Sequence, residues 1–309
     1  MSKRKTGVPP PGGQPLARLL AVALWLGSAI AQPLWAIEVI DATGRRVQLE
    51  RPAERIVALA PHTVENVFAA GAGDKLVGAV SYSDYPEAAK AIPRVGSYQA
   101  WSLEAIIARH PDLIILWGSG NSLEALPALQ RLGIAVYISE PRRLEDIPAT
   151  LRAIGQLADT SAVAERHALD FEQRLVALRE QYGRQRELSV FYQVWNDPLQ
   201  TVNGEQYLSD VIALCGGRNI FADSSHIAPR ISVEAVLARD PEVIIASGMG
   251  ASRPDWLDEW LAYPSLQAVR QRALFFIHPD LLQRPTTRLL QGAEQMCRQL
   301  AGLRESTRH

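Results

Sequence analysis

The sequence has few cysteines and no excess of charge of either sign. Two of its 309 residues are cysteine, and 32 basic residues nearly balance 33 acidic ones, which leaves a formal net charge of −1. Because nucleic-acid binding requires a basic surface, we expect no nucleic-acid partner. After residue 36 the chain also lacks long charge runs and low-complexity tracts, and its hydrophobic content of 47% is sufficient for packed cores.

Common catalytic motifs are missing as well. The sequence contains no Gly-x-Ser-x-Gly elbow, no phosphate-binding P-loop, no His-Glu-x-x-His motif and no cysteine–histidine pair close in sequence. Its six histidines are scattered and show no metal-ligand spacing. We therefore expect a protein that is not an enzyme and that holds no resident metal or cofactor.

The first 36 residues are predicted to be a signal peptide with a short extension. Basic residues at 3–5 precede an apolar stretch at 19–30, which is short for a membrane-spanning helix, and Ala29-Ile-Ala31 is a typical cleavage sequence. Ala36 is a second possible cleavage site, and an uncleaved anchor is the alternative. No cysteine follows closely enough to carry a lipid. We expect a mature protein exported to the periplasm.

Both cysteines, Cys215 and Cys297, lie in the second half of the chain. In an oxidising compartment an even pair is expected to form one disulfide, which would tie the C-terminal helix to the second half. Two buried free thiols are the alternative.

A long central helix is predicted to join two lobes. Thr160 and Ser161 are typical N-cap residues, and no proline or glycine follows before Gly183. One apolar stripe is formed by Phe171, Leu175, Leu178 and Tyr182. A helix of about 23 residues spans about 35 Å, so we expect a rigid strut and small lobe movements. The predicted domains are an N-terminal lobe at 37–158, a linking helix at 159–186 and a C-terminal lobe at 187–309.

Short buried strands alternate with helices on both sides of the strut. This pattern predicts an α/β protein in which each lobe contains a mostly parallel sheet with flanking helices. The stretch 102–115 also resembles 232–245, since each has a serine cap, a short helix, a proline stop and an apolar strand. The lobes therefore share an architecture, and the cleft between them is the expected binding site.

Aromatic residues gather in the loops expected at or near the strand ends. These residues are Tyr82, Tyr85, Tyr98, Trp101, Trp117 and Trp195. Flat rings suit a bulky planar ligand, although any one of them could instead pack onto its own lobe.

Several charged residues and one histidine are further candidates. Arg284, with Asp280 in the same loop, could clamp a ligand amide, carboxylate or phosphate, or form a surface ion pair. His62, after Pro61 at a helix start, could ligate a metal in a bound macrocycle or simply pack there. Glu104 and Glu234 hold equivalent places in the repeat, where they could stabilise a helix dipole or dock onto arginines of a partner.

With these residues, the chain resembles the periplasmic substrate-binding proteins of the helical-backbone class, which serve ABC importers of iron–siderophores, haem and vitamin B12. The resemblance covers about residues 38–303 and is greatest for the cobalamin (vitamin B12)-binding members. It is carried by four motifs: Ser81-Tyr-Ser-Asp-Tyr-Pro86, Leu116-Trp117 with Gly120-Asn121, Cys215-Gly-Gly-x-Asn-Ile-Phe221, and Asp280 with Arg284 ahead of a helix that carries Cys297.

The resemblance implies that a cobalamin-like corrinoid is captured between the lobes, without chemical change, and delivered to the permease of an ABC importer. It also implies a Cys215–Cys297 disulfide and docking of Glu104 and Glu234 onto permease arginines. We expect a monomer. The ligand-binding residues predicted in total are Pro61, His62, Tyr82, Tyr85, Tyr98, Trp117, Trp195, Asp280, Leu281, Leu282, Gln283 and Arg284.

The chain departs from the family pattern in the second lobe, where Ala228 and Leu281 replace expected tryptophans. Two alternatives therefore stay open. One is a haem or ferric-siderophore carrier of the same family, and the other is a corrinoid- or metal-handling enzyme on a similar scaffold.

Overall fold

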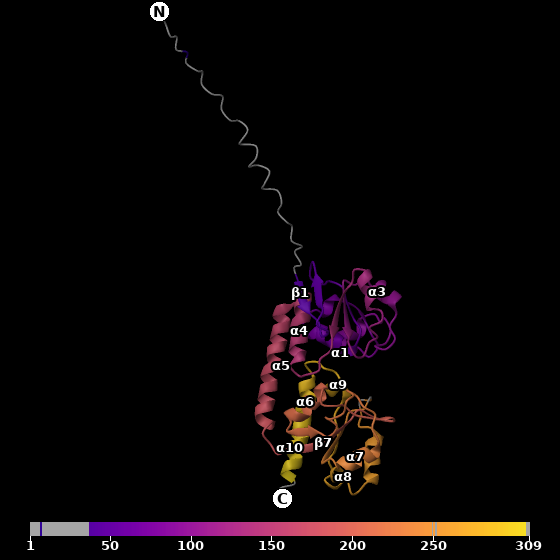
Figure 1. Ribbon diagram of the computed structural model, residues 1–309, viewed down its shortest axis with the longest axis vertical. Helices are drawn as coiled ribbons and strands as arrows, with labels where there is room; N and C mark the ends of the chain where they lie inside the picture. The colour runs from indigo at the N-terminus through magenta and orange to yellow at the C-terminus, as the bar shows by residue number, and fades with distance from the viewer. Residues whose placement is uncertain (1–6, 8–36, 249, 251, 307–309) are drawn as a thin grey trace, which may run out of the picture. The chain divides into compact units, whose positions relative to one another are not determined.

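The computed structural model describes residue 7 and residues 37–248, 250 and 252–306. The predicted signal peptide therefore lies, apart from Gly7, outside the described residues. Among the residues described, no helix combines the length and apolar character needed to cross a membrane. The chain forms two α/β lobes, each built on a four-stranded parallel sheet, as the sequence predicts (Figure 1).

The first lobe begins with an antiparallel hairpin of β1 (Ile37–Ile40) and β2 (Arg46–Leu49). Its sheet has the order β4-β3-β5-β6. The strands of this sheet are β3 (Ile56–Ala58), β4 (Leu76–Ala79), β5 (Leu113–Trp117) and β6 (Ala135–Ser139). The helices of this lobe are α1 (Pro61–Ala69), η1 (Gly73–Lys75), η2 (Glu87–Ala91), α2 (Leu103–Ile107), α3 (Leu126–Arg131) and α4 (Asp146–Leu157).

The second lobe follows α5 (Ser161–Tyr182), and its sheet has the order β10-β7-β11-β12. The strands of this sheet are β7 (Leu188–Gln193), β10 (Gly217–Asn219), β11 (Val243–Ala246) and β12 (Leu274–Phe276). A two-stranded ribbon joins β8 (Trp195–Asn196) and β9 (Leu199–Gln200). The helices are α6 (Tyr207–Leu214), α7 (Val233–Arg239), η3 (Asp255–Ala262), α8 (Gln267–Arg270), α9 (Pro279–Leu282) and α10 (Leu289–Ser306).

The two sheets have the same topology. In each lobe the first strand lies between the second and the third, and the fourth lies outside the third. Every pairing within these sheets is parallel. The carboxyl ends of all four strands of a lobe therefore lie at one edge of its sheet, together with the loops that leave them.

Helix α5 packs on the cores of both lobes. Its first turns place Ala164 in the first-lobe core, whereas Phe171, Leu175 and Leu178 lie in the second-lobe core. Figure 1 shows α5 beside α4, and Arg152 of α4 binds Glu165 of α5 at 2.7 Å and Glu172 at 2.6 Å. The strut is thus held along its length rather than crossing open solvent.

The expected disulfide is present. Cys215, which follows α6, is bonded to Cys297 of α10, and both are fully buried in the second-lobe core. The bond closes a segment with a sequence separation of 82 residues and joins α10 to the end of α6.

One local prediction was wrong. Thr160 makes no side-chain cap on α5, because its backbone (φ −121°, ψ 25°) is not extended as a capping serine or threonine usually is. Among the residues described, its buried hydroxyl has no hydrogen-bond partner. Helix α1 begins at Pro61, where a proline in the first turn has no N–H to leave unpaired.

Candidate functional site

A cavity of about 380 Å³ lies between the two lobes at the ends of their strands. Residues after β5 and β6 form its first-lobe wall, namely Trp117, Ser119, Glu140, Pro141 and Arg142. Its second-lobe wall consists of Val194, Val202, Gln206, Tyr207, Leu208, Ile227, Ala228, Gln283 and Pro285. The parallel topology explains the location, because the carboxyl ends of the strands leave their loops at this edge.

Trp117 is the aromatic residue of the first-lobe wall, and Asn121 fixes the loop that follows it. The Asn121 side-chain oxygen accepts from the Trp117 backbone N–H at 2.6 Å. Its amide group donates to the carbonyls of Leu59 at 2.9 Å and Tyr98 at 2.5 Å. One buried amide therefore ties together the loops after β3, β4 and β5, which holds the indole in place.

Two rings support Trp117. His62 meets the indole edge to face with centroids 5.2 Å apart, and Tyr98 lies tilted against it at 5.8 Å. Burial, aided by the positive charge of Arg284, lowers the pKa of His62 to about 3, so this ring is neutral at physiological pH. Its Nε2 is buried and has no hydrogen-bond partner among the described residues.

A polar cluster lies beside Trp117 on the same wall. The Glu140 carboxylate accepts from the Ser119 backbone N–H at 2.7 Å and from the Ser119 hydroxyl at 2.9 Å. It also binds the Arg142 Nε at 2.9 Å. Within the described part of the chain, the Nε is the atom of the Arg142 side chain that takes part in this cluster.

The second-lobe wall is mainly aliphatic. Small or branched residues such as Val194, Val202 and Ala228 line it, with amides at two points. The Gln206 side chain caps α6 by accepting from Leu208 N–H at 2.6 Å, and Gln283 donates to the Gly248 carbonyl at 2.9 Å. Part of each amide is therefore used by the fold.

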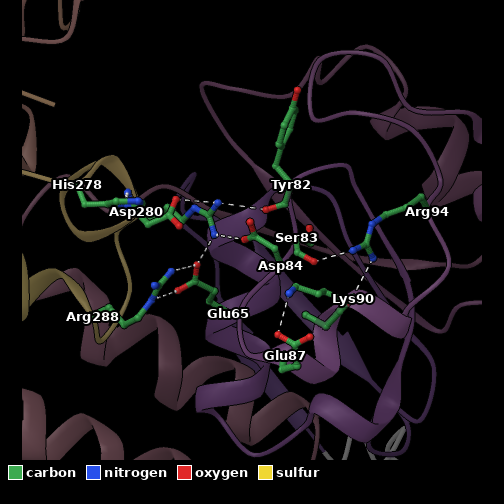
Figure 2. A network of polar contacts seen from close by, with 12 residues as sticks. Glu65, Tyr82, Ser83, Asp84, Glu87, Lys90, Arg94, His278, Asp280 and Arg288 are labelled. Atoms are coloured by element: carbon green, nitrogen blue, oxygen red, sulfur yellow. Dashed lines mark hydrogen bonds and ion pairs between the residues drawn. The ribbon is translucent and has the colours of Figure 1, made fainter. Parts of the chain in front are cut away.

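Asp280 and Arg284 lie together at the lobe boundary, with their charged groups 2.9 Å apart. Arg284 also binds Glu65 at 2.7 Å and Asp84 at 2.9 Å, both in the first lobe (Figure 2). Burial alone would lower the pKa of Arg284, but hydrogen bonds to Glu65 and Asp84 outweigh it and raise the pKa. The guanidinium is charged and occupied by protein carboxylates.

The remaining predicted ligand residues fall into different surroundings. Tyr82 is 75% exposed and has a positive φ of 64°, and its ring stands away from the ionic network in Figure 2. Tyr85 lies under the Arg288 guanidinium at 3.8 Å. Trp195, in the ribbon, donates to the Asp197 carbonyl at 2.9 Å.

Leu281, Leu282 and Pro61 are used mainly by the fold. Leu282 is fully buried in the second-lobe core, and Leu281 packs against that core from outside. Pro61 is the first residue of α1 and is half-buried. Of the predicted set, Trp117 and Gln283 line the cavity, and His62 and Tyr98 lie behind Trp117.

Glu104 and Glu234 have matching surroundings. Each is the second residue of its helix, α2 or α7, after a serine whose hydroxyl caps that helix. Each is fully exposed, and hydrogen bonds from its own backbone N–H and from the serine hydroxyl lower its pKa. Two anionic side chains, one per lobe, are thus presented to solvent.

The sequence reasoning did not single out several lining residues, of which Glu140 and Arg142 carry charge. A signal for them existed, since β6 ends at Ser139 and Glu140 follows directly, just as Trp117 ends β5. Gln206 carries no such signal, whereas Ile227 and Pro285 are the sequence neighbours of Ala228 and Arg284. Among the residues described, no group of three or more histidine, cysteine or acidic side chains is arranged to hold a metal ion.

Comparison with protein families gives a match to the periplasmic binding protein family over residues 56–281. Among curated relatives, the Vitamin B12-binding protein of Vibrio campbellii is 37% identical over 254 residues, covering 82% of this chain and 92% of that protein. The Vitamin B12-binding protein of Vibrio cholerae serotype O1 is 40% identical over 246 residues, covering 80% and 88%.

Solved structures give matching folds. The periplasmic vitamin B12 binding protein BtuF of Vibrio cholerae superposes with a TM-score of 0.75 at 38% identity, covering 82% of this chain and 98% of that one. The periplasmic heme-binding protein RhuT from Roseiflexus sp. RS-1 superposes with a TM-score of 0.72 at 25% identity, covering 81% and 99%.

Proposed function

Because the chain belongs to the periplasmic binding protein family, we propose that it captures cobalamin between its lobes and delivers it to an ABC importer. The ligand is bound and released without chemical change. The relatives named above, at 37% and 40% identity, are vitamin B12-binding proteins, which supports cobalamin as the ligand. Export to the periplasm follows from the same proposal.

The observation that carries this proposal is the cavity wall built around Trp117. A tryptophan held by Asn121 and backed by His62 and Tyr98 offers a rigid flat face to a planar macrocycle. Opposite lies an aliphatic wall with Ala228, which suits the apolar edge of a corrin ring. Glu140 and Arg142 supply polar contacts for the amide side chains and the phosphodiester of cobalamin.

Cobalamin is larger than a cavity of about 380 Å³, so part of it must extend beyond the lined volume. Tyr82 fits this part of the proposal. A non-glycine residue held at φ 64° with its ring 75% exposed is unfavourable unless the ring has a task, and covering a protruding ligand provides one.

Delivery requires a membrane partner, and we assign its docking to Glu104 and Glu234. Each is exposed and anionic at the same position of a repeated helix. Exposed carboxylates attract arginines of a partner and steer association more than they stabilise the fold. One carboxylate on each lobe would also let the permease pull on both lobes.

The test is a calorimetric titration of the mature protein with cyanocobalamin, with haemin as the comparison ligand. We expect one-to-one binding of cobalamin, weakened by about 2 kcal/mol or roughly 30-fold in Trp117→Ala, because an aromatic anchor is lost. Trp256→Ala is the matched control, since Trp256 lies outside this cavity, and it should bind as the parent does.

Two results would contradict the proposal. One is haemin binding with no cobalamin binding, which would make the chain a haem carrier on the same fold. The other is equal loss of cobalamin affinity in Trp117→Ala and Trp256→Ala, which would place the ligand elsewhere or mean that both changes merely unfold the protein.

A further inference from the structure

One buried carboxylate of the first lobe binds two arginines of the second lobe. Glu65, on α1, has a side chain that is only 3% exposed. It accepts from Arg284 at 2.7 Å, and from Arg288 through Nε at 3.0 Å and a terminal nitrogen at 2.7 Å. Figure 2 shows Arg288 reaching Glu65 from the other lobe. Glu65 is thus the centre of an ionic contact that crosses the lobe boundary.

Both terminal nitrogens of Arg284 are engaged. Besides Glu65, the guanidinium binds Asp84 at 2.9 Å, Asp280 at 2.9 Å and the Tyr82 carbonyl at 3.2 Å. The Arg284 side chain is only 13% exposed, as is that of Arg288. Arg284 therefore joins the two lobes, and it is not a free arginine waiting for a ligand.

Because the ionic contact at Glu65 is buried, it affects the separation of the lobes. A buried ion pair adds little net stability compared with apolar packing, but loss of one partner is strongly unfavourable because an uncompensated charge remains. If the lobes parted, Glu65 would lose its hydrogen bonds to both arginines. Water would then have to hydrate the carboxylate and the two guanidinium groups. The network therefore favours one lobe separation over others.

The same contact holds part of the cavity wall. Next to Glu65, the Asn66 side chain donates to the Pro285 carbonyl at 3.1 Å. Pro285 and Gln283 line the cavity and flank Arg284 in sequence. The segment from 283 to 288 is thus fastened to α1 of the first lobe by both residues, Glu65 and Asn66.

We propose that Glu65 is a positioning residue that sets the width of the ligand cleft by holding Arg284 and Arg288 across the lobe boundary. The unloaded protein is then already close to its ligand-bound separation, so a ligand enters a preformed cleft. Release to a permease requires the lobes to part, and this breaks the Glu65 contacts. The link to a ligand rests on the proposed function, whereas the lobe separation does not.

The experiment measures lobe separation in the unloaded full-length mature protein. Spin labels are attached to cysteines introduced at Leu132 and Leu261, which are exposed and lie in different lobes. In Glu65→Gln we expect a longer and broader distance distribution than in the parent. Glu65→Asp retains the charge and should restore a distribution nearer to the parent.

A matched control is available within one lobe. Glu242 of the second lobe is also largely buried and binds Arg186 at 2.7 Å and the Ser189 backbone N–H at 2.8 Å. Glu242→Gln therefore removes a similar ionic contact that does not cross the boundary, and the distance distribution should not change. If Glu65→Gln and Glu242→Gln broaden it equally, the effect is general loosening and the proposal is overturned.

Ligand kinetics provide the second readout. Release of cyanocobalamin from Glu65→Gln should be faster by roughly tenfold or more, because breaking a buried charge contact acts mainly on dissociation. Arg288→Gln leaves the Glu65–Arg284 pair and should give a smaller change in both measurements, so it serves if Glu65→Gln does not fold.

The outcomes separate the two proposals. If the parent does not bind cobalamin, the proposed function fails, and the distance measurement still tests Glu65. If the parent binds cobalamin but neither Glu65→Gln nor Arg288→Gln alters the lobe separation, the role of Glu65 is overturned and the proposed function stands.

Discussion

The two lobes share a topology, but they present different residues at equivalent strand ends. When the repeat is extended by two residues, Trp117 of the first lobe corresponds to Ser247 of the second. Trp117 lines the cavity, whereas Ser247 is fully buried and donates to the Ile277 carbonyl at 3.0 Å. At this position one lobe thus places a side chain at the cavity, and the other places one that stabilises the sheet.

The lobes also differ in how they are fastened. In the first lobe, Asn121 joins three loops through hydrogen bonds. The second lobe instead has a disulfide between α10 and the end of α6. Two lobes of the same topology thus carry different side chains and different fastenings at the edge that borders the cavity.

The lobes remain alike at Glu104 and Glu234, the positions proposed for docking, and reversing their charge is expected to have the largest effect. Glu104→Arg with Glu234→Arg should reduce cobalamin uptake into vesicles carrying the importer to background, because the two introduced arginines would repel the arginines of the partner. Each single variant should give a similar intermediate loss, while cobalamin affinity stays unchanged. Glu124→Arg, at an exposed site outside the repeated helices, is the control.

Unchanged uptake in the double variant would rule out the docking role. A much larger loss from one single variant than from the other would show that the lobes are not equivalent at the interface.

Removing the disulfide should weaken the second lobe selectively. For a closed segment with a separation of 82 residues, the chain-entropy model gives a loss of about 4.5 kcal/mol in the free energy of unfolding. The variant carries Cys215→Ala and Cys297→Ala, because serine at these buried positions would leave hydroxyls without partners. Urea unfolding measures the loss, and amide hydrogen exchange should locate the faster opening in α6 and α10. Equal acceleration in the first-lobe sheet would contradict this difference between the lobes.

Acid should weaken the first lobe through His62, with the smallest of these effects. Burial lowers the pKa of His62 to about 3, below the ordinary value of 6.5, so the unfolded chain takes up a proton before the folded one does. Above about pH 6.5, His62 makes no contribution to the pH dependence of stability. As the pH drops from 6.5, the free energy of unfolding decreases, and at pH 5 the loss is about 2 kcal/mol. His62→Met should remove this part of the pH dependence.

His167→Gln is the control for that measurement, because His167 lies on the exposed face of α5. If the parent and His62→Met lose stability in parallel between pH 6.5 and 5, His62 is not the titrating group.

Much of the fold could be predicted from the sequence because it depends on local patterns. Alternating strands and helices indicated the parallel sheets, and the repeat at 102–115 and 232–245 predicted two related lobes. The apolar stripe on α5 is buried as expected from its spacing. The Thr160 cap failed because capping depends on one backbone conformation, which residue type alone does not determine.

The site was harder to predict because its contacts join distant parts of the chain. The ion pair of Arg284 with Asp280 was one of the alternatives that their spacing indicated, and it is present. The partner Glu65 lies 219 residues from Arg284, so no spacing could show that the first lobe also binds the guanidinium. Leu282 fell inside the segment expected at the ligand, yet its side chain is fully buried in the core. Glu140 and Arg142 belong to no motif, and only the three-dimensional arrangement of β5 and β6 brings them beside Trp117.

The central claim is that one ligand contacts two unlike walls at once. Amide hydrogen exchange of the mature protein, with and without saturating cyanocobalamin, tests it most directly. The account predicts slower exchange in the presence of ligand at 117–121 and 140–142 of the first lobe and at 202–208 and 227–228 of the second. Slowing confined to one lobe, or absent from both walls, would contradict it.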